Sequence, residues 1–171
     1  MKLMNKMVAP RSLAAMMALA IAGSMAAATP GVAKPAHHAA RAAAVHPASG
    51  LKVVPLTVTT TNGRHVFRVE VAVTEEEQAK GLMFRTAMGA DEGMIFPMNP
   101  PRGAAFWMKN TVIPLDIVFI GPDHRVLNVA ANAVPYDLTP LPSIGRAAGV
   151  LELNGGRAAQ IGLKAGDKVV W

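Results

Sequence analysis

The sequence of 171 residues contains no cysteine, few aromatic residues and, beyond residue 50, almost no net charge. Without cysteine the chain cannot form a disulfide, a thiolate metal site or a cysteine nucleophile, and it cannot carry a cysteine-linked lipid. The net charge of +6 belongs mainly to residues 1–50, because residues 51–171 contain 12 Lys and Arg against 11 Asp and Glu. This balance lacks the excess of positive charge that binds a phosphate backbone, so we expect no nucleic-acid partner.

The one long apolar run of the chain lies near its N-terminus and predicts export. Residues 1–11 carry three positive charges and no acid, and residues 12–28 are nearly all apolar or small before Pro30 interrupts them. These features are typical of a secretory signal peptide, with small residues suited to cleavage after Ala28 or Ala33. An uncleaved membrane anchor is the alternative, although a run of about 17 residues is at the lower limit for a membrane span. We therefore expect a periplasmic or secreted protein without stable membrane insertion after cleavage.

Residues 29–50 are rich in Ala, Pro and His and show no apolar period, so we interpret them as a flexible linker. Three histidines, His37, His38 and His46, lie in this segment. Neighbouring imidazoles can bind a divalent ion weakly, but in a disordered tether such binding is more often incidental.

Residues 51–171 are expected to form a single mostly-β domain. The alternating runs Val53–Thr60 and His65–Val73 flank Asn62-Gly63, a pair that favours a tight hairpin turn. Thr74 and Glu77 have the spacing of a capping box, which predicts a short helix that ends at Gly81.

The remaining runs predict more short strands and a second short helix. Strands are expected at residues 93–96, 104–109, 115–120, 125–134, 150–153 and 168–171, and a helix at residues 156–163. Many short strands with two short helices favour a compact β-sandwich or barrel.

Two runs, Ala104–Lys109 and Asp116–Ile120, are predicted to pair as an antiparallel hairpin. Strand alternation then places Phe106, Met108, Ile117 and Phe119 on the core face, and Trp107, Lys109, Asp116 and Val118 on the outward face. In this arrangement Lys109 and Asp116 form a cross-strand ion pair beside a large aromatic side chain. The outward face is then either a binding platform or the surface of a stapled hairpin.

Glu152 is a further candidate, because Leu151 and Leu153 take the core face of their strand and leave Glu152 on the other. If this strand neighbours the predicted hairpin, Asp116 and Glu152 could form a carboxylate pair. Two carboxylates that share a site can separate their pKa values and act as acid and base.

Several motifs together resemble a known family. They are Gly81-Leu82-Met83-Phe84-Arg85, Gly93-Met94-Ile95-Phe96, Phe106-Trp107-Met108-Lys109-Asn110-Thr111, Pro114-Leu115-Asp116 and Val150-Leu151-Glu152-Leu153-Asn154-Gly155-Gly156. In this order they resemble family 192 of the bacterial and archaeal domains of unknown function, over about residues 52–171. The resemblance implies a compact, mostly-β fold of jelly-roll-like sandwich type, and it implies no reaction. The family's motif positions give the candidate ligand-binding residues Arg85, Trp107, Lys109, Asn110, Asp116 and Glu152.

These observations favour an exported domain that binds a small ligand on a Trp/Lys/Asp face. Alternatives are an envelope protein-interaction module, a hydrolase that uses Asp116 and Glu152, and a copper-binding protein that uses methionine thioethers. Met83, Met94 and Met108 lie in apolar runs where methionine is ordinary core filler, so we expect no metal and no cofactor. Arg85 could bind a ligand carboxylate or pair with Asp91 or Glu92.

Overall fold

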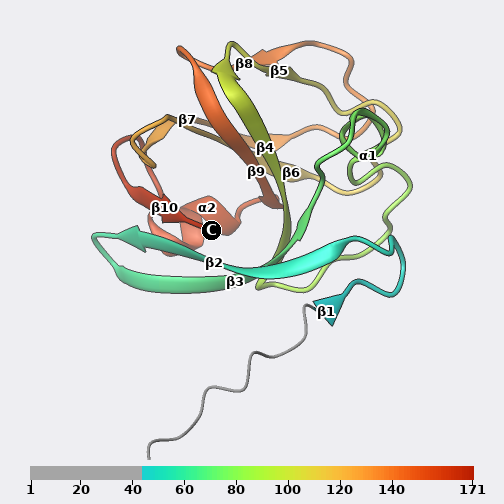
Figure 1. Cartoon of the computed structure of the whole chain (residues 1–171), viewed down its shortest axis with the longest axis horizontal. Helices are drawn as coiled ribbons and strands as arrows, with labels where there is room; N and C mark the ends of the chain where they lie inside the picture. The colour runs from blue at the N-terminus through green and yellow to red at the C-terminus, as the bar shows by residue number, and fades with distance from the viewer. Residues whose placement is uncertain (1–43) are drawn as a thin grey trace, which may run out of the picture. The chain divides into compact units, whose positions relative to one another are not determined.

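The structure is a computed structural model that describes residues 44–171, so the predicted signal peptide and residues 29–43 of the predicted linker lie outside it. The described chain is mostly β, with two short helices (Figure 1). The strands are Ala44–Val45 (β1), Lys52–Thr60 (β2), Gly63–Val71 (β3), Glu92–Arg102 (β4), Ala105–Phe106 (β5), Leu115–Ile120 (β6), Val126–Ala133 (β7), Leu141–Pro142 (β8), Ala147–Asn154 (β9) and Lys168–Val170 (β10), and the helices are Glu75–Lys80 (α1) and Arg157–Ile161 (α2). The predicted compact, mostly-β class with two short helices is confirmed. Within residues 44–171, no helix is long and apolar enough to cross a membrane.

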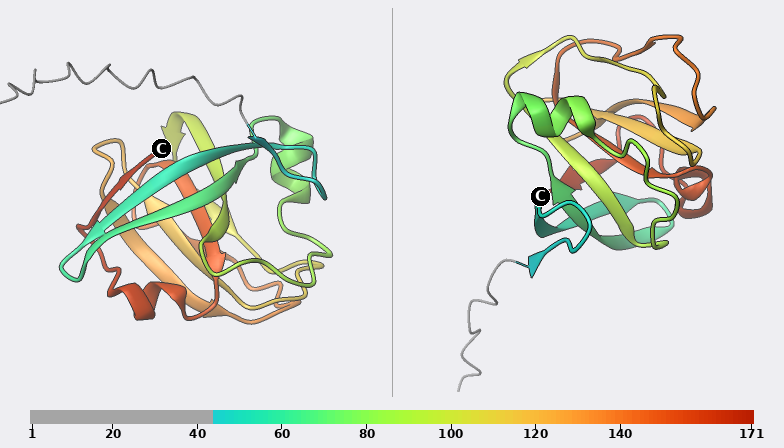
Figure 2. Two further views of the ribbon diagram at one scale, coloured as in Figure 1. Left: turned by 90° about the horizontal axis from the view of Figure 1, so that it is seen from below. Right: turned by 90° about the vertical axis from the view of Figure 1, so that its right-hand side faces the viewer.

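Eight strands form one main sheet. Its order is β1-β2-β3-β4-β9-β6-β7, with β10 paired to β2, and β5 and β8 form a separate two-stranded sheet. Neighbouring strands are antiparallel except β3 and β4, which are parallel. The long β2–β3 hairpin crosses the direction of β4 and β9 (Figures 1 and 2). The described strands thus curl within one mixed sheet and do not close into a barrel or divide into the two large sheets of a sandwich.

The central strands β4, β9 and β6 are buried on both faces. On one face, Ile95, Leu151 and Val118 pack with the β2–β3 hairpin and α2. On the other face, Phe96 and Ile117 pack in a second cluster, with the end of α1 and the loops around β5. Because apolar residues cover both faces, every residue of β6 is buried. The predicted outward face for Val118 is therefore wrong.

The two local signals at the start of the domain are confirmed. Thr60 pairs with Gly63 at the end of the β2–β3 hairpin, and Gly63 has the positive φ of +125° that the turn requires. The Thr74 hydroxyl accepts the Glu77 amide at 3.2 Å, and the Glu77 carboxylate accepts the Thr74 amide at 2.9 Å. This capping box begins α1 after Thr74, and Gly81 ends the helix.

The folded domain begins before the predicted boundary at Leu51. Strand β1 pairs with β2 through Ala44 and Val45, and the Ser49 hydroxyl donates to the buried carboxylate of Glu70. Residues 44–50 are therefore part of the fold and not of a flexible linker. The composition of residues 44–50 did not predict that they fold, because their contacts are made by a two-residue strand and by polar side chains.

The predicted hairpin between Ala104–Lys109 and Asp116–Ile120 is wrong. Only Ala105 and Phe106 of the first run form a strand, and they pair with Leu141 and Pro142 of β8. The second run, β6, pairs instead with β7 and β9. A continuous apolar strand buries both of its faces and pairs along both edges in the centre of a sheet, which an isolated hairpin does not allow.

Candidate functional site

A cleft of about 450 Å³ opens beside the C-terminal end of α1. One wall is the segment from Gln78 to Met83, and the other is the segment from Arg102 to Thr111. Glu152 of β9 contributes to the lining between these walls. The larger apolar side chains of the lining are Leu82, Met83, Phe96, Met98, Phe106 and Trp107.

Glu152 is the unusual residue of this cleft, because a carboxyl group lies on an apolar sheet face. It pairs with Met94 of β4 and Ile117 of β6, so it shares their face of the sheet. Only 5% of the residue is exposed, and among the described residues its carboxyl has no hydrogen-bond or ion-pair partner. Burial disfavours the charged form and raises the pKa of Glu152 to about 8. The group is therefore mainly a neutral acid at pH 7, able to donate one hydrogen bond and to accept others.

Trp107 and Lys109 stand at the exposed side of the cleft. Trp107 is 49% exposed, and the Lys109 ammonium lies 5.3 Å from the centroid of its ring. The segment that carries them is fixed by backbone bonds at Met108, whose amide donates to Asp137 and whose carbonyl accepts from Tyr136. The two side chains are thus presented to solvent by a loop whose backbone is well bonded.

Aromatic packing supports this wall from below. The Phe106 ring packs edge-on against Phe96, with centroids 5.0 Å apart, and against Phe119 at 6.2 Å. These rings belong to the buried cluster on the Glu152 face of the sheet. The wall on the Trp107 side therefore rests on the core.

Asn110 joins the two walls but does not line the cleft. Its carbonyl accepts the Phe84 amide at 2.9 Å, and its side-chain amide lies 3.8 Å from the Met83 sulfur. Asn110 adopts a positive φ of +53°, which asparagine tolerates better than most residues. Its observed contacts therefore hold the segment around Met83 against the segment around Lys109.

Asp116 lies on the opposite face of the sheet from Glu152. It pairs with Leu153, which belongs to the other buried cluster, and it is completely buried. Its carboxylate accepts the amides of Asn132 at 2.8 Å, Gly156 at 3.1 Å and Ala158 at 2.6 Å. Because α2 begins at Arg157 after a glycine, Asp116 supplies the cap that the helix's own sequence lacks.

Two predictions about Asp116 are therefore wrong. It does not form a surface ion pair with Lys109, and it does not form a carboxylate pair with Glu152. Glu152 pairs with Ile117, the residue after Asp116 in β6. Successive residues of a strand point to opposite faces, so the sheet lies between the two carboxyl groups.

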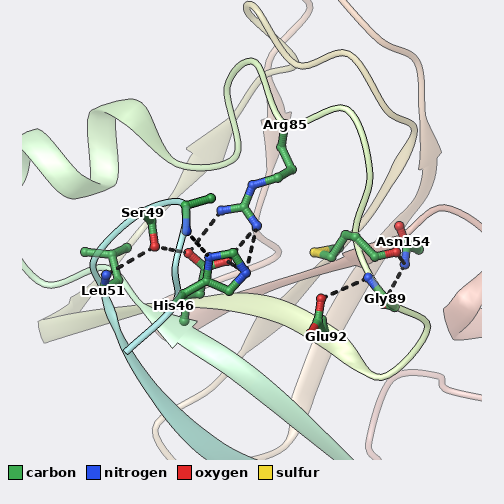
Figure 3. Close-up of polar contacts among 10 residues, drawn as sticks. His46, Ser49, Leu51, Arg85, Gly89, Glu92 and Asn154 are labelled. Atoms are coloured by element: carbon green, nitrogen blue, oxygen red, sulfur yellow. Dashed lines mark hydrogen bonds and ion pairs between the residues drawn. The ribbon is translucent and has the colours of Figure 1, made fainter. Parts of the chain in front are cut away.

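Arg85 is engaged by a buried carboxylate rather than by Asp91 or Glu92. Its guanidinium bonds both oxygens of Glu70, at 2.9 and 3.1 Å, and Glu70 is 3% exposed. His46 and Ser49 approach the same pair from the N-terminal segment (Figure 3). The loop acids have other partners: Asp91 pairs with Arg157 at 2.7 Å, and Glu92 accepts the Gly89 amide at 3.0 Å.

Of the six candidate residues, the cleft brings together Trp107, Lys109 and Glu152, and it leaves Arg85, Asn110 and Asp116 outside its lining. Sequence reasoning did not select Lys80, Arg102 and Thr111, which line the same cleft. Thr111 is the last residue of the Phe106–Thr111 motif, so of the three it was the easiest to select from the sequence. Lys80 and Arg102 are brought there by the end of α1 and the end of β4, which no local pattern connects.

The methionines are mostly core residues. Met94, Met98 and Met108 are buried in the cluster on the Glu152 face, and Met83 and Met98 line the cleft. Within residues 44–171, no group of three or more His, Asp or Glu side chains could hold a metal ion.

Comparison with known proteins places the chain in a family. The model of DUF192, described as an uncharacterised family, matches residues 57–171. The chain belongs to this family. A crystal structure of a protein of unknown function from Novosphingobium aromaticivorans DSM 12444 is 67% identical over 77% of this chain and 94% of that chain, with a TM-score of 0.75. No curated protein matches this DUF192 chain.

A second structure, from Sinorhizobium meliloti 1021, is 36% identical over 70% of this chain and 94% of that chain, with a TM-score of 0.68. That protein is described as a candidate transcription regulator. The family and the Novosphingobium relative are of unknown function, so the activity of this DUF192 domain has to be argued from its own geometry.

Proposed function

We propose that this DUF192 domain binds a small organic ligand in the cleft between α1 and the Trp107 segment, with Trp107, Lys109 and Glu152 in contact with it. The observation that carries the proposal is the carboxyl of Glu152, which lies on an otherwise apolar sheet face, bonds no described residue and lines an open cleft. A group with a strongly raised pKa in a cleft marks a candidate functional site.

Stability gives no reason for a carboxyl at this position. Burial disfavours its charged form, whereas a leucine would add apolar contact with Met94 and Ile117. The carboxyl oxygens of Glu152 are not among the fully enclosed polar atoms that lack a partner, and the residue lines the cleft. A ligand in the cleft can therefore exchange hydrogen bonds with this carboxyl.

The cleft favours binding over hydrolysis. Among residues 44–171, Glu152 is the only acidic residue that lines it, and Asp116 faces the other side of the sheet. Acid–base hydrolysis of the glycosidase type needs two carboxyl groups within about 10 Å on one substrate. The described residues of this cleft supply one.

We further infer that the domain works outside the cytoplasm, in the periplasm or beyond the cell. The support is the sequence of residues 1–28, with its basic start, apolar run and small-residue exit. A ligand present in the bacterial envelope would then be the natural occupant.

Binding of a partner protein is a second candidate, favoured by exposed apolar residues close to the cleft. Val134, Tyr136 and Leu138 are each more than half exposed, and Tyr136 bonds through its backbone to Met108 beside Trp107. DNA binding, suggested by the description of the Sinorhizobium relative, has less support here, because residues 51–171 carry a net charge near +1.

The test is native mass spectrometry of the protein purified without chelator after expression of the full chain. We expect an additional mass that is lost in Trp107→Ala and Glu152→Leu and retained in Tyr136→Ala, a matched exposed aromatic outside the cleft lining. If the wild type carries no additional mass and takes none up from a dialysate of envelope extract, the proposal is wrong. An additional mass retained in all three variants would place the ligand elsewhere.

A further inference from the structure

We infer that the ligand of this cleft is an acidic saccharide, meaning a sugar or short oligosaccharide that carries a carboxylate; the inference rests on the proposed function. Its basis is the combination of three features in one cleft: cationic side chains, an exposed aromatic ring, and the uncharged hydrogen-bonding groups of Gln78, Thr111 and Glu152, which we call the floor although the first two belong to the walls.

The charge of the lining selects against cations and in favour of anions. Lys80, Arg102 and Lys109 line the cleft, all three are exposed, and none forms an ion pair among the described residues. Glu152 is mainly uncharged at pH 7 and does not balance them. A ligand carboxylate at the exposed side would therefore meet three cations without displacing an existing partner.

The exposed aromatic ring suits the apolar face of a sugar. Trp107 is half exposed, and it directly follows Phe106, whose ring packs against Phe96. A sugar ring combines an apolar face with polar edges, so a flat aromatic side chain beside polar groups matches both. Lys109 lies over the same indole ring, which places a cation next to the position of a stacked sugar.

The floor supplies groups that both donate and accept hydrogen bonds, as sugar hydroxyls require. The neutral Glu152 carboxyl can do both. Thr111 uses its hydroxyl hydrogen on the Lys109 carbonyl, which leaves the oxygen as an acceptor. Gln78 donates its amide to the carbonyls of Ala72 and Pro97, which fixes the side chain and leaves its oxygen free among the described residues.

Other small ligands fit these features less well. A fatty acid would satisfy the cations but would lay its chain against Glu152 and leave the carboxyl unpaired. An amine would pair with Glu152 only after ionising it and would be repelled by the three cations. A neutral sugar would use the ring and the floor and leave the cations unused.

The experiment is isothermal titration calorimetry of the purified protein with three probes at pH 7: trigalacturonate, the neutral sugar cellotriose, and hexanoate. We expect trigalacturonate to bind at least tenfold more tightly than cellotriose, and hexanoate to give no binding. Lys109→Gln should weaken trigalacturonate at least fivefold, and by a larger factor than it weakens cellotriose. Lys164→Gln, an exposed lysine outside the cleft lining, is the matched control and should behave as wild type.

The outcomes separate this inference from the proposed function. Equal affinity for the acidic and neutral trimers overturns the acidic class, and binding of hexanoate alone overturns the saccharide; in both cases ligand binding in the cleft stands if Trp107→Ala abolishes it. If no probe binds, but native mass spectrometry detects a ligand that Trp107→Ala loses, the saccharide inference alone fails. If that ligand is absent as well, both fail.

Discussion

Replacing Glu152 by glutamine should remove a pH dependence of folding stability that the buried acid creates. In the folded domain the pKa of Glu152 is raised from its ordinary value of 4.5 to about 8. Between these two values the folded state keeps the proton and the unfolded state releases it. The free energy of unfolding therefore falls as pH rises, by up to about 1.4 kcal/mol per pH unit.

The full effect follows from the distance between the two pKa values. The contribution is complete below pH 4.5 and is lost as pH rises through about 8, which amounts to roughly 5 kcal/mol at most. This is a large part of the ~5–15 kcal/mol that typically stabilises a domain. Glutamine has nearly the shape of the protonated acid and does not titrate, so Glu152→Gln should be the more stable protein above pH 8.

The assay is urea unfolding of wild type and Glu152→Gln at pH 5, 6, 7, 8 and 9, followed by tryptophan fluorescence. For a slope of about 2 kcal/mol per molar urea, the difference between the two midpoints should change by roughly 0.7 M per pH unit between pH 5 and 8. The histidines cancel in this difference because both proteins contain them. Glu75→Gln, at an exposed position of α1, is the control and should show a constant difference. A constant difference for Glu152→Gln as well would refute the buried, protonated carboxyl.

Three further results are expected. Asp116→Asn should lower the free energy of unfolding by about 2–3 kcal/mol in urea unfolding, because one amide oxygen replaces two carboxylate oxygens that accept three backbone amides; a loss below about 0.5 kcal/mol would contradict its capping role. Arg85→Met should cost about 3 kcal/mol, measured in the same way, because it leaves Glu70 buried without its cation, and a neutral effect would show that the pair is solvated. Trp107→Ala and Tyr136→Ala should each change stability by less than about 1 kcal/mol, but only Trp107→Ala should lose the additional mass in native mass spectrometry. An equal loss in both would assign the additional mass to the wider exposed apolar surface.

The parts of the fold that could be predicted were those determined by residues close together in the sequence. The hairpin turn, predicted from Asn62-Gly63 and formed at Thr61-Asn62 before Gly63, and the capping box from Thr74 to Glu77 depend on backbone preferences and on hydrogen bonds that span three residues. The class followed from many short apolar runs. Strand partners did not, because pairing depends on the whole sheet: β6 lies between β7 and β9 rather than beside the Trp107 segment.

The same limit explains what could be predicted of the candidate site. Glu152 was selected because a charged residue between Leu151 and Leu153 must face away from their side of the strand, and the structure places it there. Asp116 has the same local appearance, a single acid at the edge of an apolar run. Its role differs from that of Glu152: it accepts backbone amides at the start of α2, about forty residues later in the chain. The residues around Asp116 do not indicate that α2 packs there.

The N-terminal segment and the cleft are connected through side chains that sequence composition assigned to separate parts. Ser49 donates to Glu70, and Glu70 holds the guanidinium of Arg85. The backbone amide of Arg85 in turn donates to Leu82, which lines the cleft beside Met83. Since removing one partner of a buried ion pair is strongly destabilising, the position of this wall depends on the Glu70–Arg85 pair and on the segment that covers it. Residues 44–50 are therefore best regarded as part of the structure that shapes the cleft, although their composition is that of a tether.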